Sequence, residues 1–80
     1  MAGRRASRKV LLRAEAVWER LNRLNMSQNE LARTLGISTG HLSRLINGRR
    51  CPSPRMRKLL MDALNCPEFD DLFVVVSDDE

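Results

Sequence analysis

The middle of the sequence contains two short helical segments whose ends are marked by capping residues and glycines. Ser27 is followed three residues later by Glu30. This spacing is typical of a capping box, in which each side chain accepts a hydrogen bond from the other residue's backbone N–H. Gly36 then ends the first segment, because glycine adopts the left-handed conformation without a steric clash. Ser38 can cap the second segment, and Gly48 ends it. The pattern therefore predicts two helices joined by a tight turn, over residues 28–35 and 39–47.

Both segments carry apolar residues on one side, at the steps of three and four that a buried helix face requires. These inward residues are Leu31, Ala32, Leu35, Leu42, Leu45 and Ile46. The small side chain of Ala32 allows the two helices to approach closely, and Ile37 in the turn can fill the angle between them. A capped helix, a glycine turn and a second helix form a helix-turn-helix. An αα-corner that does not bind DNA would share these features.

The sequence before this unit predicts one longer helix. Ser7 is a suitable N-cap, and apolar residues follow it at helical steps, at Val10, Leu11, Ala14, Val17, Trp18, Leu21 and Leu24. Because Trp18 shares this apolar register, we expect its side chain in the core rather than at the surface as a platform for nucleic-acid bases.

The sequence after the unit predicts a further helix and a less regular end. Ser53 and Pro54 form a strong helix start, because proline suits the first helical position. The inner side of that helix carries Met56, Leu59, Leu60, Ala63 and Leu64. A turn or short helix over 67–72 follows. Residues 73–76 are β-prone, and they form either a short strand or an apolar strip laid on a partner. We therefore expect an all-α fold, a compact bundle of four to five helices, to which this end could add one strand.

Charge is segregated along the chain. Residues 1–66 contain all 14 lysines and arginines but only four acidic residues, whereas residues 67–80 contain six acidic residues and no basic one. The strongly basic body suits a polyanionic partner such as nucleic acid. The length allows one domain. We divide it into a flexible basic arm at 1–6, a globular domain at 7–73, and an apolar strip with an acidic tail at 74–80.

The sequence offers little chemistry for catalysis or for metal binding. His41 is the one histidine, and no nucleophile–base pair or phosphate-binding loop accompanies it, so we expect no enzyme and no cofactor. Cys51 and Cys66 lack the further ligands of a zinc site and are interpreted as reduced, small apolar residues. No apolar run approaches the ~20 residues of a membrane span, and the N-terminus does not resemble a secretory signal. We therefore expect a cytoplasmic protein without a membrane partner.

The stretch MSQNELARTLGISTGHLSRLINGRRCPS, residues 26–53, resembles the lambda-repressor and Cro-like helix-turn-helix family, also called the XRE family. The resemblance covers about residues 14–73. Its most specific parts are Ser27-Gln28 with Leu31-Ala32, Leu35-Gly36-Ile37-Ser38, Leu42-Ser43-Arg44-Leu45, and Asn47-Gly48-Arg49-Arg50 with Pro52. It implies a lambda-repressor-like bundle that docks the helix at 39–47 in the major groove of DNA, often as a dimer.

The resemblance also implies roles for individual residues. The residues that match base-contacting positions are Thr39, Gly40, Ser43 and Arg44. Gln28 matches a phosphate-binding position, and Asn47 with the loop after it matches further phosphate contacts. Two departures matter. Gly40 has no side chain with which to read a base. Ile46 stands where the family often has an acidic residue, which removes a repulsive charge near DNA or adds apolar surface.

The chemistry of these residues agrees with such roles. Arg44 can form two parallel hydrogen bonds with guanine. The helix N-termini at Ser27 and Ser38 offer backbone N–H groups and a positive dipole end to phosphate. Arg49 and Arg50 would add charge pairs with phosphate unless they form a solvated loop. We interpret His41 as a phosphate contact or a plain surface histidine.

Two further groups of residues are candidates for contacts outside the helix pair. An N-terminal arm could reach along the DNA backbone or into a minor groove, or it could be a solvated tail; its basic residues are Arg4, Arg5, Arg8 and Lys9. The C-terminal strip is too apolar for a free tail. It either makes a homodimer contact or folds back onto its own subunit, and its residues are Phe69, Leu72, Phe73, Val74, Val75 and Val76.

Two functions follow from these features. The first is a sequence-specific regulator of transcription that binds double-stranded DNA, most simply a repressor and a dimer on a palindromic operator. The second is a protein-interaction module, such as an antitoxin or an anti-activator, whose C-terminal strip binds a protein partner.

Overall fold

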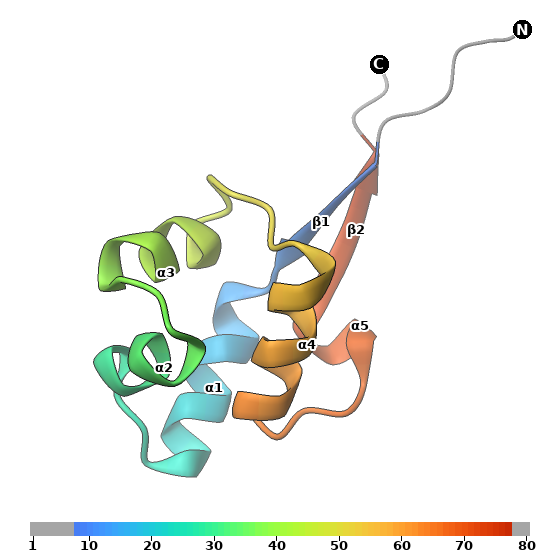
Figure 1. Ribbon diagram of the computed structural model, residues 1–80. Coiled ribbons are helices and arrows are strands. Elements are labelled where there is room, and N and C mark those ends of the chain that lie inside the picture. Colours follow the sequence, from blue (N-terminus) through green and yellow to red (C-terminus); the bar gives the residue numbers. More distant parts are fainter. Residues whose placement is uncertain (1–7, 78–80) are drawn as a thin grey trace, which may run out of the picture.

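The computed structural model describes residues 8–77, which form five helices and one two-stranded sheet (Figure 1). In chain order the elements are β1 (Arg8–Leu12), α1 (Ala14–Leu24), α2 (Gln28–Leu35), α3 (Thr39–Ile46), α4 (Pro54–Ala63), α5 (Phe69–Leu72) and β2 (Phe73–Ser77). The predicted arm at 1–6 and the acidic residues 78–80 lie outside the described residues.

The capping residues set the ends of α2 and α3 as their spacing predicts. The Ser27 hydroxyl accepts a hydrogen bond from the Glu30 backbone N–H at 3.0 Å, and the Ser27 backbone N–H donates to the Glu30 carboxylate at 2.8 Å. Gly36 ends α2 with a φ of 74°, in the left-handed region that favours glycine. The Ser38 hydroxyl accepts from the His41 backbone N–H at 3.0 Å and begins α3.

The start of α4 is also confirmed. The Ser53 hydroxyl accepts a hydrogen bond from the Met56 backbone N–H at 3.1 Å, and Pro54 occupies the first turn. Proline fits there because that turn has no intrahelical partner for its missing N–H. Local chemistry is therefore enough to set where three of the helices begin.

The helix predicted from Ser7 is wrong over its first part, because residues 8–12 form the strand β1. β1 pairs antiparallel with β2, and the register places Val10 opposite Val75 and Leu12 opposite Phe73. The strand predicted at 73–76 is confirmed and extends to Ser77. The all-α label is therefore not exact. The short apolar run Val10-Leu11-Leu12 is compatible with either a helix or a strand, and the partner of this strand lies more than sixty residues away.

Every helix and strand contributes at least one buried residue to the core, and in β2 this is the first residue, Phe73. Its buried residues are Leu12, Val17, Leu21, Leu31, Ala32, Leu35, Leu42, Leu45, Ile46, Leu60, Leu64, Cys66, Leu72 and Phe73. The expectation that Trp18 is a core residue is wrong, since 43% of its surface is exposed. Val17 and Leu21 are the buried residues of α1. Trp18 follows Val17 by about 100° around the helix, which turns it toward solvent.

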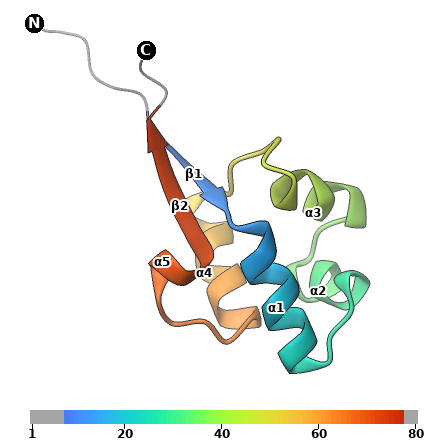
Figure 2. The same cartoon turned by 180° about the vertical axis from the view of Figure 1, so that it is seen from behind.

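The C-terminal segment folds back onto its own chain. Leu72 and Phe73 are fully buried, and the rings of Phe69 and Phe73 lie 5.1 Å apart. Arg13 holds this segment at the start of α1: its backbone N–H donates to the Leu72 carbonyl at 2.8 Å. Its Nε lies 3.1 Å from the Asp70 and Phe73 carbonyl oxygens, to which it donates. Figure 2 shows β2 beside α5 and the outer end of the β1–β2 ribbon projecting away from the helices, while β1 also contacts α3.

A second arginine joins α1 to the end of α4. Arg20 Nε donates to the Leu64 carbonyl at 3.0 Å, and its Nη2 donates to the Asn65 carbonyl at 2.9 Å. The last carbonyls of a helix have no intrahelical donor, so Arg20 satisfies groups that water would otherwise have to bond. Arg13 and Arg20 are thus structural, and they are not part of the free basic surface.

We predict that Phe73→Ala destabilises the fold by about 3–5 kcal/mol, because it removes a fully buried ring and leaves a cavity. Val75→Ala is the matched control on the same strand, since 49% of Val75 is exposed in the single chain; at concentrations where the protein is monomeric its cost should be under about 1 kcal/mol. Urea denaturation followed by circular dichroism measures both. Equal effects would contradict the packing of β2 on its own chain.

Candidate nucleic-acid interface

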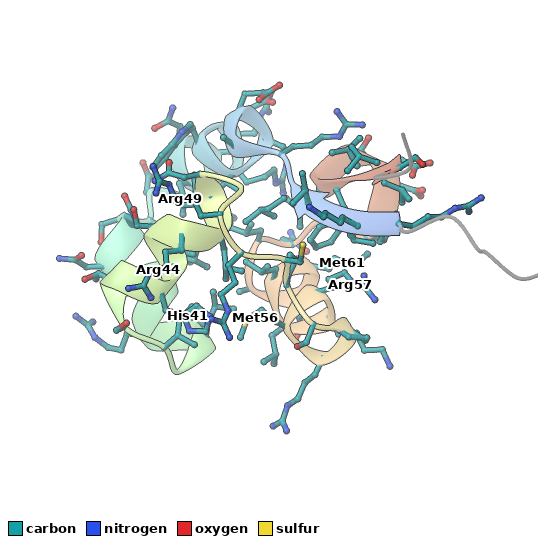
Figure 3. The ribbon with its side chains drawn as sticks, turned by 90° about the horizontal axis from the view of Figure 1, so that it is seen from above. His41, Arg44, Arg49, Met56, Arg57 and Met61 are labelled. Carbon is teal, nitrogen blue, oxygen red and sulfur yellow. The ribbon has the colours of Figure 1, made fainter. Side chains whose placement is uncertain are left out.

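The second helix of the helix-turn-helix, α3, has one buried side and one polar, exposed side. Leu42, Leu45 and Ile46 are buried in the core. On the opposite side the exposed residues are Thr39, Gly40, Arg44 and Asn47, with Ser43 half-buried beside them. The predicted base-contacting residues therefore lie together on one surface. In Figure 3, Arg44 extends from α3 toward the viewer and away from the core.

The end of α3 fixes two of these polar side chains relative to each other. The Asn47 side-chain amide donates to the Ser43 hydroxyl at 3.4 Å, and the Asn47 backbone N–H donates to the Ser43 carbonyl at 2.9 Å. The pair leaves the amide oxygen of Asn47 and the hydroxyl hydrogen of Ser43 able to bond a ligand. Asn47 therefore lies at the boundary between the exposed side of α3 and the loop that follows.

The N-termini of α2 and α3 lie at the same edge of the molecule (Figure 1). The hydroxyls of Ser27 and Ser38 accept hydrogen bonds from N–H groups in their own helices. The remaining N–H groups in the first turns of α2 and α3 have no intrahelical acceptor. The positive ends of both helix dipoles also lie at this edge. Gln28, the first residue of α2, is half-buried here. The arrangement is suited to binding phosphate oxygens.

The loop after α3 returns across the end of that helix. Gly48 has a φ of 77°, and the backbone N–H groups of Arg49 and Arg50 donate to the Arg44 carbonyl at 2.9 and 3.2 Å. Both arginine side chains are exposed. Neither has an ion-pair partner among residues 8–77. The loop therefore holds two unpaired cations close to the last turn of α3.

His41 lies apart from the exposed side of α3. It is half-buried and lines a hollow of about 110 Å³ between α3 and the start of α4, together with Arg50, Ser53 and Met56. Figure 3 shows His41 beside Met56, whereas Arg44 projects elsewhere. The structure thus separates His41 from the residues that match base-contacting positions. It remains close to Arg50.

Two positions that depart from the family pattern have plain structural explanations. Ile46 is only 5% exposed, so it adds to the core and the expectation of extra apolar surface is wrong. A Cβ at Gly40 would meet only the Ser38 hydroxyl, at 3.9 Å. This is an ordinary contact, so the packing of the chain itself does not require glycine there.

The remaining candidates do not belong to the exposed side of α3. Arg8 and Lys9 are exposed on β1, whereas Arg4 and Arg5 fall outside the described residues.

Cys51 is exposed and Cys66 is buried, both as free thiols. Within residues 8–77 no cluster of three metal-ligating side chains occurs, and no helix is long and apolar enough to cross a bilayer.

Sequence reasoning missed one group of basic residues. Arg55, Arg57 and Lys58 lie on the first two turns of α4, and Arg57 and Lys58 border a hollow beside β1. The signal was their close spacing after Pro54. Only the tertiary structure reveals that an apolar surface adjoins them.

Comparison with known proteins gives one match. The model of a helix-turn-helix family matches residues 18–70, which is more than half of the chain. No curated protein sequence and no solved structure matches significantly. The matched segment contains α2, α3, the turn at Gly36 and the loop with Arg49 and Arg50. By this match and by its architecture, the chain belongs to the lambda-repressor and Cro-like, XRE-type family of helix-turn-helix proteins, whose domain binds DNA in regulators.

Proposed function

We propose that this protein is a sequence-specific repressor of transcription that binds double-stranded DNA with α3 in the major groove. The observation that carries the proposal is the polar, exposed side of α3, which lies opposite a buried side and beside two helix N-termini. Repression is the simplest regulatory act for such a surface, because occupation of a promoter by itself excludes other proteins. We propose the cytoplasm as its location, where it would meet chromosomal DNA.

Base recognition is assigned to Arg44 with help from Thr39 and Ser43. Arg44 can donate two hydrogen bonds to O6 and N7 of a guanine. The hydroxyls of Thr39 and Ser43 can bond a base edge, and the hydrogen bond from Asn47 restricts the orientation of Ser43. Gly40 contributes its exposed backbone and allows close approach to DNA.

Phosphate binding is assigned to the residues around this surface. Backbone N–H groups at the helix starts, together with basic and amide side chains, hold the DNA backbone and set the register of α3. The residues proposed for this role are Ser27, Gln28, Ser38, His41, Asn47, Arg49 and Arg50. Arg8 and Lys9 on β1 are proposed for weaker contacts farther along the DNA.

We further propose that the protein is a homodimer joined through β2. β2 pairs with β1 alone among the described strands, so its other edge has backbone groups without a strand partner. It carries three consecutive valines, and Val75 is 49% exposed. Leu72 and Phe73 are buried within the chain, which leaves the contact to residues 74–76. Two copies would match operator half-sites about one helical turn apart.

Arg44→Ala should relax base discrimination by about 1–3 kcal/mol at one operator position. Gln28→Ala should instead weaken binding to all sequences alike, because a phosphate contact carries no sequence information. The measurement is a set of binding isotherms on a selected genomic fragment and its single-base variants, over a range of salt concentrations.

Arg23→Ala is the matched control for the loss of a positive charge. Arg23 is exposed on the last turn of α1, and its surface ion pair with Glu19 contributes little. The Arg23→Ala variant should therefore prefer the same DNA bases as the wild type. The proposal fails if Arg44→Ala and Arg23→Ala give the same profile, or if no genomic fragment binds more tightly than random DNA.

Val75→Lys should convert the proposed dimer into a monomer, because it places two like charges at the strand-to-strand contact. Sedimentation equilibrium measures the change, and circular dichroism checks that the fold persists. The matched control is Leu59→Lys, on α4, at a side chain that is 36% exposed. A wild-type monomer at high micromolar concentration would refute the dimer without affecting the assignment of α3.

A further inference from the structure

The outer side of α4 borders an apolar groove that DNA binding does not use. α4 packs against α2 on its inner side, where Leu60 and Leu64 are buried. On its outer side, a hollow of about 410 Å³ lies between α4, β1 and α5, lined by Val10, Pro54, Arg57, Lys58, Met61 and Phe69. Figure 3 shows Arg57 and Met61 next to each other on the side of α4 near β1, apart from Arg44.

A second hollow continues the groove toward the end of α4. It has a volume of about 490 Å³ and includes Leu59 and Pro67. Lys58 and Met61 line both hollows, so the two form one surface along the helix. Leu59 is among the most exposed large apolar side chains of the described residues, at 36%. Methionine adapts its shape readily and is frequent at surfaces that bind peptides.

The cations at the edge of the groove indicate the charge of its ligand. The side chains of Arg57 and Lys58 have no ion-pair or hydrogen-bond partner among residues 8–77. Asp62 is the acidic residue that borders the second hollow, one turn farther along α4. An apolar floor with two unpaired cations at its edge suits a ligand that has apolar side chains on one side and carboxylates flanking them.

The same charges disfavour a second copy of the chain in this groove. A two-fold axis through the groove would bring the Arg57–Lys58 pairs of the two copies together, and like charges at an interface destabilise it. Asp71 of α5 does not offset this, because it lines a separate hollow with Arg20 and Arg23 beside α1.

We propose that the groove between α4, β1 and α5 is a docking site for an acidic, amphipathic segment of another protein. The segment lays apolar side chains at helical spacing over Met61, Leu59 and Phe69, and its carboxylates pair with Arg57 and Lys58. The site lies apart from the exposed side of α3, so a protein partner and DNA can bind at once. This inference rests on the fold and on the charge pattern and does not depend on the proposed DNA-binding function.

A display library of random peptides of about 16 residues, long enough for four helical turns, tests the proposal. Selection on the full chain should enrich peptides in which Asp or Glu flank apolar residues at i, i+3 or i+4, and i+7. A selected peptide should bind the Arg57→Glu/Lys58→Glu variant at least about tenfold more weakly, since attraction becomes repulsion. Amide shifts in NMR spectra should map to Val10, Met61 and Phe69.

The matched control is Arg33→Glu, which reverses a charge at an exposed residue in the last turn of α2 outside the lining of either hollow. It should change the affinity by less than about twofold, as a distant surface charge does. Lys58→Glu alone, at an exposed site, serves if the double variant fails to fold.

Several results would overturn the proposal. These are a library without enrichment, selected peptides that lack acidic residues, equal binding to the charge-reversed variant, and shifts that map to α3. A change of oligomeric state on Lys58→Glu would instead identify a second copy as the occupant. Tighter peptide binding after deletion of residues 78–80 would identify the chain's own acidic tail as the occupant.

Discussion

The position of α3 depends on the burial of Leu42, Leu45 and Ile46 in a core to which the rest of the chain contributes. A helix of eight residues is not stable in water by itself, because nucleation costs more than its few hydrogen bonds return. Its polar side, the proposed DNA contact, can therefore keep a fixed orientation only while its apolar side is held. The capping serines and Gly36 fix where the helices begin and end, and the buried leucines fix the angle between them.

The two ends of the chain complete this support. β1 and β2 join residues that are far apart in sequence, and Leu12 and Phe73 at the base of the ribbon are buried in the same core as α3. Arg13 and Arg20 bind backbone carbonyls of the C-terminal half. Some of the basic residues thus stabilise the fold, whereas the side chains of others, such as Arg49 and Arg50, are exposed and without an ion-pair partner among residues 8–77. Net charge alone does not reveal this division.

The elements that the sequence predicts well are those with local determinants. The capping box at Ser27, the turn at Gly36 and the Ser53-Pro54 start involve residues within a few positions of each other. The sequence predicts a helix over residues 8–12, where the structure has a strand, because the partner strand is remote and a short apolar run is compatible with both structures. The sequence predicts Trp18 in the core because the apolar stripe of α1 is wider than the side of the helix that packing covers.

The candidate site shows the same limit. The polar side of α3 could be read from the periodicity of its leucines, and the structure gathers Thr39, Ser43 and Arg44 on one surface. The half-buried position of His41 beside α4 could not be foreseen, because it depends on how the loop at residues 47–53 returns. The groove beside α4 could not be predicted from the sequence either, since it combines residues from β1, α4 and α5.

The most direct test of the account is methylation protection with dimethyl sulfate on the DNA fragment that the protein selects. The reagent attacks N7 of guanine, in the major groove, and N3 of adenine, in the minor groove. If α3 occupies the major groove, the protein should protect guanine N7 at one or more positions of each half-site. Adenine N3 in the same half-site should stay reactive. Protection of adenine N3 with fully reactive guanine N7 would contradict the account, because it would locate the contact in the other groove.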